Sequence, residues 1–183
     1  ALDHIRVLEF THYQQGPVAA QFLGDFGAEV IKIERPGCGD GFRCSGSTGT
    51  LNAVSSGYGP AFIACNRNKR SLTLNLKDAR GRELLHRLVK VSDVVLSNYR
   101  PAALDRLGLD GESLLTINPR IICAYGTGYG LSGPDRDTMG QDMMGQCRGG
   151  LVRGDPPGTL GFNLADQLGG MLLAMGVIAA LAA

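Results

Sequence analysis

The residues with the clearest chemical potential lie near the start of the last apolar segment. Between Leu164 and Ala183, only Asp166 and Gln167 carry a charged or strongly hydrogen-bonding side chain. A carboxylate at the mouth of an apolar helix can stabilise the helix N-terminus, where backbone N–H groups lack partners and the dipole is positive. It can also be a nucleophile at the edge of a dry site, with two glycines one turn later allowing close approach. This segment by itself favours the helix-stabilising role.

The remaining nucleophiles and bases are isolated. His4, His12 and His86 have no serine or cysteine partner at a recognisable spacing, so none of them is predicted to be catalytic. The five cysteines form no CxxC pair and have no histidine at ligand spacing, which predicts reduced thiols in a reducing compartment and no metal site.

Other charged residues have ordinary structural interpretations. Five carboxylates on predicted helix faces or strand ends are expected to be solvated or ion-paired: Asp25, Glu29, Glu34, Asp78 and Glu83. The basic run at residues 66–70 could form a solvated turn or grip a phosphate, and the turn is favoured.

Composition excludes several classes of protein. Of the 183 residues, 44% are hydrophobic and 19% are charged, as in an ordinary globular domain with a core of good size. A net charge of +1 and the absence of tryptophan argue against nucleic-acid binding. The last helix contains an Asp, a Gln and several glycines and is rich in alanine, so a core helix is favoured over a membrane span. No signal peptide is visible, and a cytoplasmic location is expected, with mitochondria and peroxisomes as alternatives.

The elements that must position these residues alternate between strand and helix. Strands are predicted at residues 5–10, 30–34, 72–76, 93–98 and 120–125, and helices at 18–27, 78–91, from Pro101, at 114–118 and at 163–183. The first strand–helix–strand unit is typical of a parallel sheet. We therefore predict an α/β fold, with a Rossmann-like, open and mainly parallel sheet flanked by helices and ending in a long apolar helix.

The loops refine this prediction. Residues 11–17 follow the first strand without the GxGxxG pattern that a dinucleotide pyrophosphate requires, so NAD and FAD are not expected. The Gly- and Ser-rich residues 36–60 form a long loop of the kind that is often functional. We expect a core sheet over about residues 1–130, a peripheral Gly- and Pro-rich excursion over 131–162, and the Asp166 helix over 163–183.

Taken in order, several segments resemble one family, the class III CoA-transferases, which includes formyl-CoA transferase and carnitine CoA-transferase. The matching segments are residues 7–11 with 14 and 16–17, 23–34, 36–40, 66–71, 93–95 with 98–101, 118–122, 128–130 with 133–134, and 165–166. They cover essentially the whole chain in a fixed order.

The resemblance implies an acyl-CoA:carboxylate CoA-transferase in which Asp166 attacks the acyl-CoA thioester. A mixed anhydride and an aspartyl-CoA thioester would follow, and partial desolvation would raise the reactivity of the carboxylate. The implied substrates are an acyl-CoA and a small carboxylic acid such as oxalate, formate or succinate. Coenzyme A would be a substrate, with no permanently bound cofactor.

Further site residues are implied only by the resemblance. Gln14 matches a residue near the reacting acyl group, where its amide can hydrogen-bond a developing oxyanion. The residues matching the CoA pocket are Arg35 and Arg106 for the nucleotide, Asn98 and Tyr99 for the wall and, more weakly, Arg70. Thr127 stands where some members have a lysine near CoA, so that contact is expected to be absent.

Two alternatives accompany this hypothesis. The related α-methylacyl-CoA racemases carry a histidine acid/base where this chain has Gln141, which cannot titrate, so racemase chemistry is disfavoured. Family members are also about twice as long, and two copies interlock as a homodimer. The chain is thus expected to be the N-terminal, CoA-binding part of such a protein, without its C-terminal half. Alone it would expose the apolar sides of its last helix, and it would be inactive or a non-catalytic binding fragment.

Overall fold

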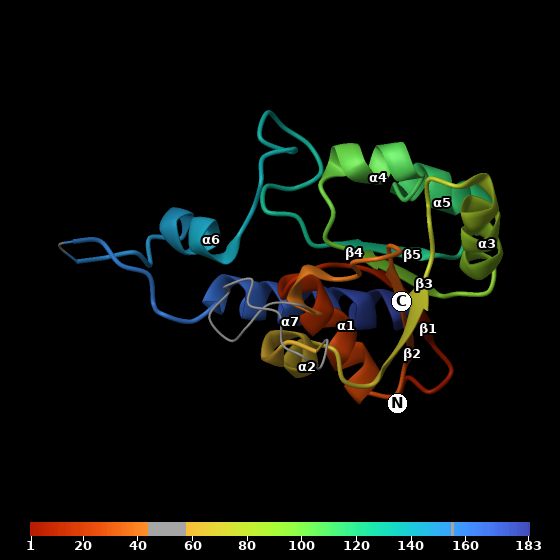
Figure 1. Ribbon diagram of the computed structural model, residues 1–183, viewed down its shortest axis with the longest axis horizontal. Coiled ribbons are helices and arrows are strands. Elements are labelled where there is room, and N and C mark those ends of the chain that lie inside the picture. The colour runs from red at the N-terminus through yellow and green to blue at the C-terminus, as the bar shows by residue number, and fades with distance from the viewer. Residues whose placement is uncertain (44–57, 155) are drawn as a thin grey trace.

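The computed structural model describes residues 1–43, 58–154 and 156–183, and its elements alternate as predicted (Figure 1). They are β1 Arg6–Phe10, α1 Gln15–Asp25, β2 Glu29–Glu34, the 3-10 turn η1 Gly41–Arg43, α2 Pro60–Cys65, β3 Lys69–Thr73, α3 Ala79–Val89, β4 Val94–Ser97, α4 Pro101–Leu107, α5 Gly111–Ile117, β5 Ile122–Tyr125, α6 Asp142–Arg148 and α7 Leu164–Leu181. Cys44 and most of the predicted loop at 36–60 lie outside the described residues.

The five strands form one parallel sheet in the order β3-β2-β1-β4-β5. Val7 of β1 pairs with Val30 of β2 on one side and with Val94 of β4 on the other. This order confirms the predicted Rossmann-like sheet. It reverses direction between β1 and β4, and ligands in such sheets bind at the carboxyl ends of the strands beside that reversal.

Helices cover both faces of the sheet, as Figure 1 shows. On one face α1 and α7 pack against β1 and β4, with Ala19, Leu23, Ala174 and Val177 in a continuous apolar cluster. On the other face α3, α4 and α5 contribute a second cluster, made of Leu85, Val89, Leu104, Leu109 and Leu114 with strand residues. Because both faces are covered, the central strands are apolar over most of their length.

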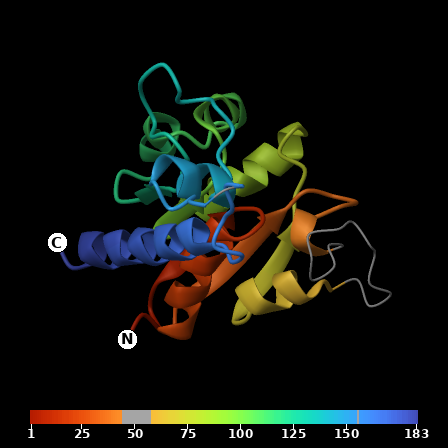
Figure 2. The same ribbon diagram turned by 90° about the vertical axis from the view of Figure 1, so that its left-hand side faces the viewer.

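Helices α1 and α7 lie side by side with their N-termini at the same end (Figure 2). A Cβ on Gly170 would lie 2.6 Å from the carbonyl oxygen of Gln15 and 2.8 Å from Cγ1 of Val18. A Cβ on Gly169 would lie 2.9 Å from the side-chain nitrogen of Gln15. The two glycines do allow a close approach, and in this structure it is the start of α1 that approaches.

The outer face of α7 is apolar and exposed, as expected for this chain on its own. Gly170, Ala174 and Val177 are buried, whereas Leu168, Met171, Leu172 and Met175 are exposed. By length and composition α7 could cross a membrane, a property that core helices of soluble proteins share. The homodimer implied by the resemblance stays a prediction.

Several predicted boundaries are wrong. β3 spans Lys69–Thr73 rather than 72–76, because this edge strand is mostly exposed and its sequence lacks an apolar pattern. α1 begins at Gln15 rather than residue 18. Pro17 can lie in the first turn because the helix uses no backbone N–H there, so the missing N–H of proline costs nothing. The short helix α2 begins at the end of the predicted loop 36–60 and continues into residues with no predicted element, and α6 lies within the excursion predicted at 131–162.

Candidate active site

The loops after β1 and β4 meet at the reversal of the sheet. The backbone N–H of His12 donates to Oδ1 of Asn98 at 3.0 Å, and Nδ2 of Asn98 donates to the carbonyl of His12 at 2.8 Å. Asn98 thereby clamps the loop of residues 11–17, and a Cβ on Gly16 would lie 3.2 Å from the carbon of its amide group. The predicted pocket residue Asn98 is thus placed beside the predicted catalytic loop.

Tyr99 completes this wall by stacking on His12. The ring centroids are 5.2 Å apart, and Oη of Tyr99 lies 3.1 Å from Nε2 of His12. Burial raises the pKa of Tyr99 to about 12 and lowers the pKa of His12, so both rings are neutral at pH 7. The two rings pack as one surface beside the loop of residues 11–17, and the prediction that His12 is not catalytic stays a prediction.

Gln14 and the start of α7 are brought together by a side-chain contact. Gln14 is half-buried and immediately precedes α1. Its Oε1 accepts a hydrogen bond of 2.5 Å from Nδ2 of Asn163, the residue that precedes α7. Asp166 lies in the first turn of that helix. Gln14 therefore contacts the residue that precedes the helix of Asp166, and their membership of one catalytic site stays a prediction.

Asp166 lies beside a second carboxylate that the sequence analysis did not identify. Its backbone N–H donates to Oδ1 of Asp142 on α6 at 2.9 Å, and Nε2 of Gln146 donates to the other Asp142 oxygen at 2.5 Å. Burial, followed by the charge of Asp142, raises the pKa of Asp166 to about 6. The segment containing Asp142 had been considered only for Gln141, an exposed residue at the start of α6.

The contact with Asp142 predicts a pH dependence. If Asp166 is the nucleophile, as the resemblance predicts, it must be ionised to attack, and the activity of the intact protein should rise with pH through about 6. Changing Asp142 to Asn removes the second cause of the raised pKa and leaves burial, so the acid limb should move to lower pH by about half a unit to one unit. The measurement is kcat/KM for acyl-CoA against pH in the intact protein. An unchanged acid limb would exclude an electrostatic role for Asp142.

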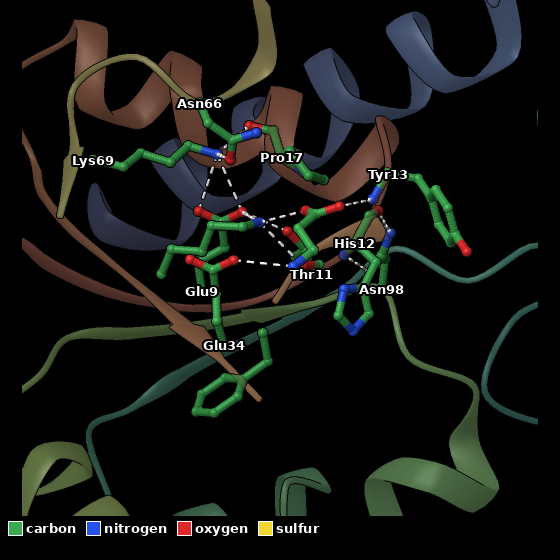
Figure 3. A network of polar contacts seen from close by, with 12 residues as sticks. Glu9, Thr11, His12, Tyr13, Pro17, Glu34, Asn66, Lys69 and Asn98 are labelled. Atoms are coloured by element: carbon green, nitrogen blue, oxygen red, sulfur yellow. Dashed lines mark hydrogen bonds and ion pairs between the residues drawn. The ribbon is translucent and has the colours of Figure 1, made fainter. Parts of the chain in front are cut away.

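A buried charge cluster, made of Glu9, Lys32, Asp40 and Lys69, contacts the loop of residues 11–17. Figure 3 shows Glu9 and Lys69 beside Thr11 and Pro17 of this loop. Nζ of Lys32 is 2.9 Å from both Glu9 Oε1 and Asp40 Oδ2, and Nζ of Lys69 is 3.0 Å from Glu9 Oε2. None of the four side chains is more than 2% exposed. Two positive and two negative charges balance there without access to water.

The two lysines of this cluster titrate differently because they have different numbers of carboxylate partners. Burial would lower the pKa of Lys32, but the carboxylates of Glu9 and Asp40 outweigh it and raise the pKa. Lys69 has only one carboxylate partner, Glu9, so the effect of burial is larger and lowers the pKa of Lys69 to about 8. Both ammonium groups are therefore charged at pH 7.

The buried charge cluster holds the loop through its backbone. Lys32 donates to the carbonyl of Thr11 at 3.1 Å, and Lys69 donates to that of Pro17 at 2.8 Å. Asp40 accepts from the N–H of Tyr13 at 3.1 Å. Tyr13 has φ 64°, a left-handed conformation that costs energy in a bulky residue. These contacts hold the backbone on both sides of Gln14 in place.

The structure separates the predicted CoA-binding arginines. Arg35 is exposed on the rim of a hollow of about 300 Å³ beyond β2 and β3, lined also by Gly39, Ser71 and Thr73. Arg106 is exposed on α4, in the helix layer on the other side of the sheet from α7. Arg70 pairs with Glu29 at 2.8 Å, at the first residue of β2 and away from the carboxyl ends of the strands. Their roles stay predictions, and only Arg35 lies at the carboxyl edge.

Other charged residues behave largely as predicted. Asp25 pairs with Arg67, Glu29 with Arg6, and Glu34 with Arg43. Asp78 caps α3 by accepting from the N–H of Arg80. Residues 66–68 form the expected turn, but Lys69 is buried within the charge cluster.

Comparisons with known proteins identify the family of the chain. The family model described as CoA-transferase family III matches residues 2–183. A formyl-CoA:oxalate CoA-transferase from Rhodopseudomonas palustris (strain BisA53) is 42% identical over 99% of this chain. A protein of the same description from Afipia carboxidovorans is 40% identical, again over 99% of this chain. In both cases the match covers 42% of the relative, so the chain spans less than half the length of these relatives.

Solved structures show the same fold. A CAIB/BAIF family protein from Brucella suis superposes with a TM-score of 0.87 and 39% identity, covering 98% of this chain and 48% of that one. A hypothetical protein (Rv3272) from Mycobacterium tuberculosis gives 0.84 and 37%, covering 99% and 50%. With a family model that matches nearly every residue and a parallel sheet that these relatives share, the chain belongs to CoA-transferase family III.

Proposed function

We propose that the intact protein is an acyl-CoA:carboxylate CoA-transferase with Asp166 as its nucleophile. The observation that carries the proposal is the setting of Asp166, a half-buried carboxylate whose pKa is raised to about 6. It lies in the first turn of the helix whose preceding residue, Asn163, holds the Gln14 amide. A partly desolvated carboxylate suits acyl transfer because desolvation strengthens the nucleophile, and in the proposed site the Gln14 amide is the donor that stabilises the oxyanion.

The first half of the reaction removes the donor acid. An Asp166 oxygen attacks the thioester carbonyl of the acyl-CoA and the C–S bond breaks. CoA leaves as a thiolate, and the acyl group remains joined to Asp166 as a mixed anhydride. The thiolate then attacks the Asp166 carbonyl carbon of that anhydride. The donor carboxylate departs, and Asp166 is left as a thioester with CoA.

The second half repeats these steps in reverse order with the acceptor. Its carboxylate attacks the Asp166 thioester, which expels the thiolate and forms a new anhydride. The thiolate attacks the acceptor carbonyl carbon, giving the new acyl-CoA and restoring the Asp166 carboxylate. No proton or electron is consumed, so the reaction needs no redox cofactor, and exclusion of water preserves the thioester energy.

The substrate class follows from the relatives. Because the two cited relatives are described as formyl-CoA:oxalate CoA-transferases, we propose formyl-CoA as donor and oxalate as acceptor for the first assay. The hollow beside Arg35 is the proposed place for the CoA nucleotide, since an exposed guanidinium at its rim can pair with phosphate.

The test is to trap the covalent intermediate. The intact protein is incubated with formyl-CoA, quenched with hydroxylamine, digested and analysed by mass spectrometry. Hydroxylamine should convert the acylated carboxylate to a hydroxamate on the peptide containing Asp166, and the Asp166→Asn variant should show none. A hydroxamate at another carboxylate, or CoA transfer by the Asn variant at the wild-type rate, would refute the proposal. Deuterium uptake at the α-carbon of a 2-methylacyl-CoA would indicate racemase activity instead.

A further inference from the structure

We propose that Asn163 is a positioning residue that selects the orientation of the Gln14 amide for catalysis. The proposal rests on the proposed function, in which Gln14 donates a hydrogen bond to the oxyanion formed at the acyl carbon. Asn163 itself is exposed and touches no reacting atom of Asp166 in the contacts of the described residues. It acts through Gln14.

The first step of the argument is that Asn163 does not perform the usual task of its position. An asparagine preceding a helix normally accepts a hydrogen bond from the N–H two or three residues later. In α7 the N–H three residues later belongs to Asp166, and Oδ1 of Asp142 accepts from it at 2.9 Å. Asn163 makes no side-chain cap. Asp142 on α6 accepts this hydrogen bond instead, so the Asn163 amide is available to bind another residue.

That partner is Gln14. Nδ2 of Asn163 donates to Oε1 of Gln14, and this contact joins the loop after β1 to the start of α7. The two ends of a glutamine amide have nearly the same shape but opposite hydrogen-bonding character. With Asn163 donating to Oε1, as in the structure, Nε2 of Gln14 is the end left to donate to a substrate oxygen. The opposite orientation would present an oxygen to a developing negative charge.

Contacts among the described residues hold the loop backbone on both sides of Gln14, so the orientation of the Gln14 side chain is what Asn163 can control. The buried charge cluster fixes Thr11, Tyr13 and Pro17 through the backbone, and Asn98 fixes His12. The position of the Gln14 backbone is set from below the loop. Asn163 is the contact that acts on the Gln14 amide from the side of α7.

Two replacements of Asn163 separate this role from a general structural one. Alanine removes the donor, so Gln14 samples both orientations, and kcat for CoA transfer should fall about tenfold with KM for acyl-CoA within about twofold of wild type. Aspartate supplies only an acceptor and would turn the Gln14 amide the wrong way, so kcat should fall about a hundredfold. Gln167→Ala, which removes an exposed amide from the same helical turn, is the matched control and should keep the wild-type kcat.

A double-mutant cycle with Gln14→Ala isolates the contact, because Asn163 should matter only while Gln14 is present. In the Gln14→Ala background, the further change Asn163→Ala should alter kcat by less than about twofold. The same tenfold loss in both backgrounds, or a wild-type kcat for Asn163→Ala alone, would overturn the proposal.

A readout without substrate distinguishes failure of this inference from failure of the proposed function. The side-chain NH2 signal of Gln14 in the intact protein should show restricted motion by 15N relaxation, and Asn163→Ala should increase that motion. Equal order in both proteins would overturn the role of Asn163, whether or not CoA is transferred. Restricted Gln14 motion in a protein that transfers no CoA would refute the proposed function and, with it, the catalytic purpose of the contact.

Discussion

Replacing Asp166 with alanine in the intact protein should lower the rate of CoA transfer by about four orders of magnitude or more. In the mechanism we propose, Asp166 forms both covalent intermediates, so no route through the anhydride remains without its carboxylate. The measurement is the initial rate of oxalyl-CoA formation from formyl-CoA and oxalate, followed by chromatography. Glu83→Gln, which changes an exposed carboxylate on α3 across the sheet, should retain the wild-type rate. An Asp166→Ala rate within tenfold of wild type would contradict the mechanism.

A replacement at Asp166 that lowers activity should raise the stability of the folded protein at neutral pH. The pKa of Asp166 is about 6 in the folded protein, above its ordinary value of 3.8, because burial disfavours the charged form. The folded state therefore binds the proton more tightly, and stability falls as pH rises from about 4 to about 6. Above that range Asp166→Asn should stabilise the protein by about 1–2 kcal/mol, reduced by solvent screening, and at pH 4 the gain should vanish. Urea unfolding at the two pH values measures it.

Replacing Lys32 with methionine should lower the free energy of unfolding by about 3–5 kcal/mol. Lys32 bonds to two carboxylates that are 0% exposed, and its loss leaves Glu9 and Asp40 with one ammonium partner between them. The remaining excess of negative charge cannot be relieved by water. The measurement is urea unfolding at pH 7, with the exposed Lys77→Met as the matched control, expected within about 0.5 kcal/mol of wild type.

A compensating variant tests the cause of that loss. Lys32→Met combined with Asp40→Asn restores charge balance in the cluster, because Glu9 then faces Lys69 alone. We expect the double variant to recover part of the lost stability, since an unpaired buried charge costs more than a neutral polar group. If the double variant loses more free energy of unfolding than the two single variants lose together, charge imbalance is not the cause.

The sequence predicts the sheet well where local and non-local signals agree. β1, β2, β4 and β5 are short β-rich runs between turn residues, and the helices predicted at 18–27 and 78–91 correspond to α1 and α3 of the covering layers. β3 was misplaced because four of its five residues are polar and most of it is exposed, whereas the buried apolar residue Leu74 follows the strand. A strand whose position depends on pairing with β2 carries little of that information in its own sequence.

Gln14 and Asp166 were predicted from motifs that resemble a family, whereas the buried charge cluster that holds the loop of Gln14 was not predicted. One signal was available: Glu9 and Lys32 are charges of opposite sign within apolar strand runs, and the register pairs them directly. Asp142 offered no comparable signal, because its contact with Asp166 depends on how α6 folds back after a long excursion.

The contact between α1 and α7 also sets an order of assembly during synthesis. Glu9 and Lys32 are 23 residues apart, whereas Gln14 and Asn163 are 149 apart. At ribosomal rates of about 5–20 residues per second, the first pair is complete within seconds, and the second must wait roughly 7–30 seconds. The nascent chain can therefore set the shape of the loop long before the reactive carboxylate leaves the ribosome. Translation would thus make the residues that hold the Gln14 loop before it makes the segment that contains Asn163 and Asp166.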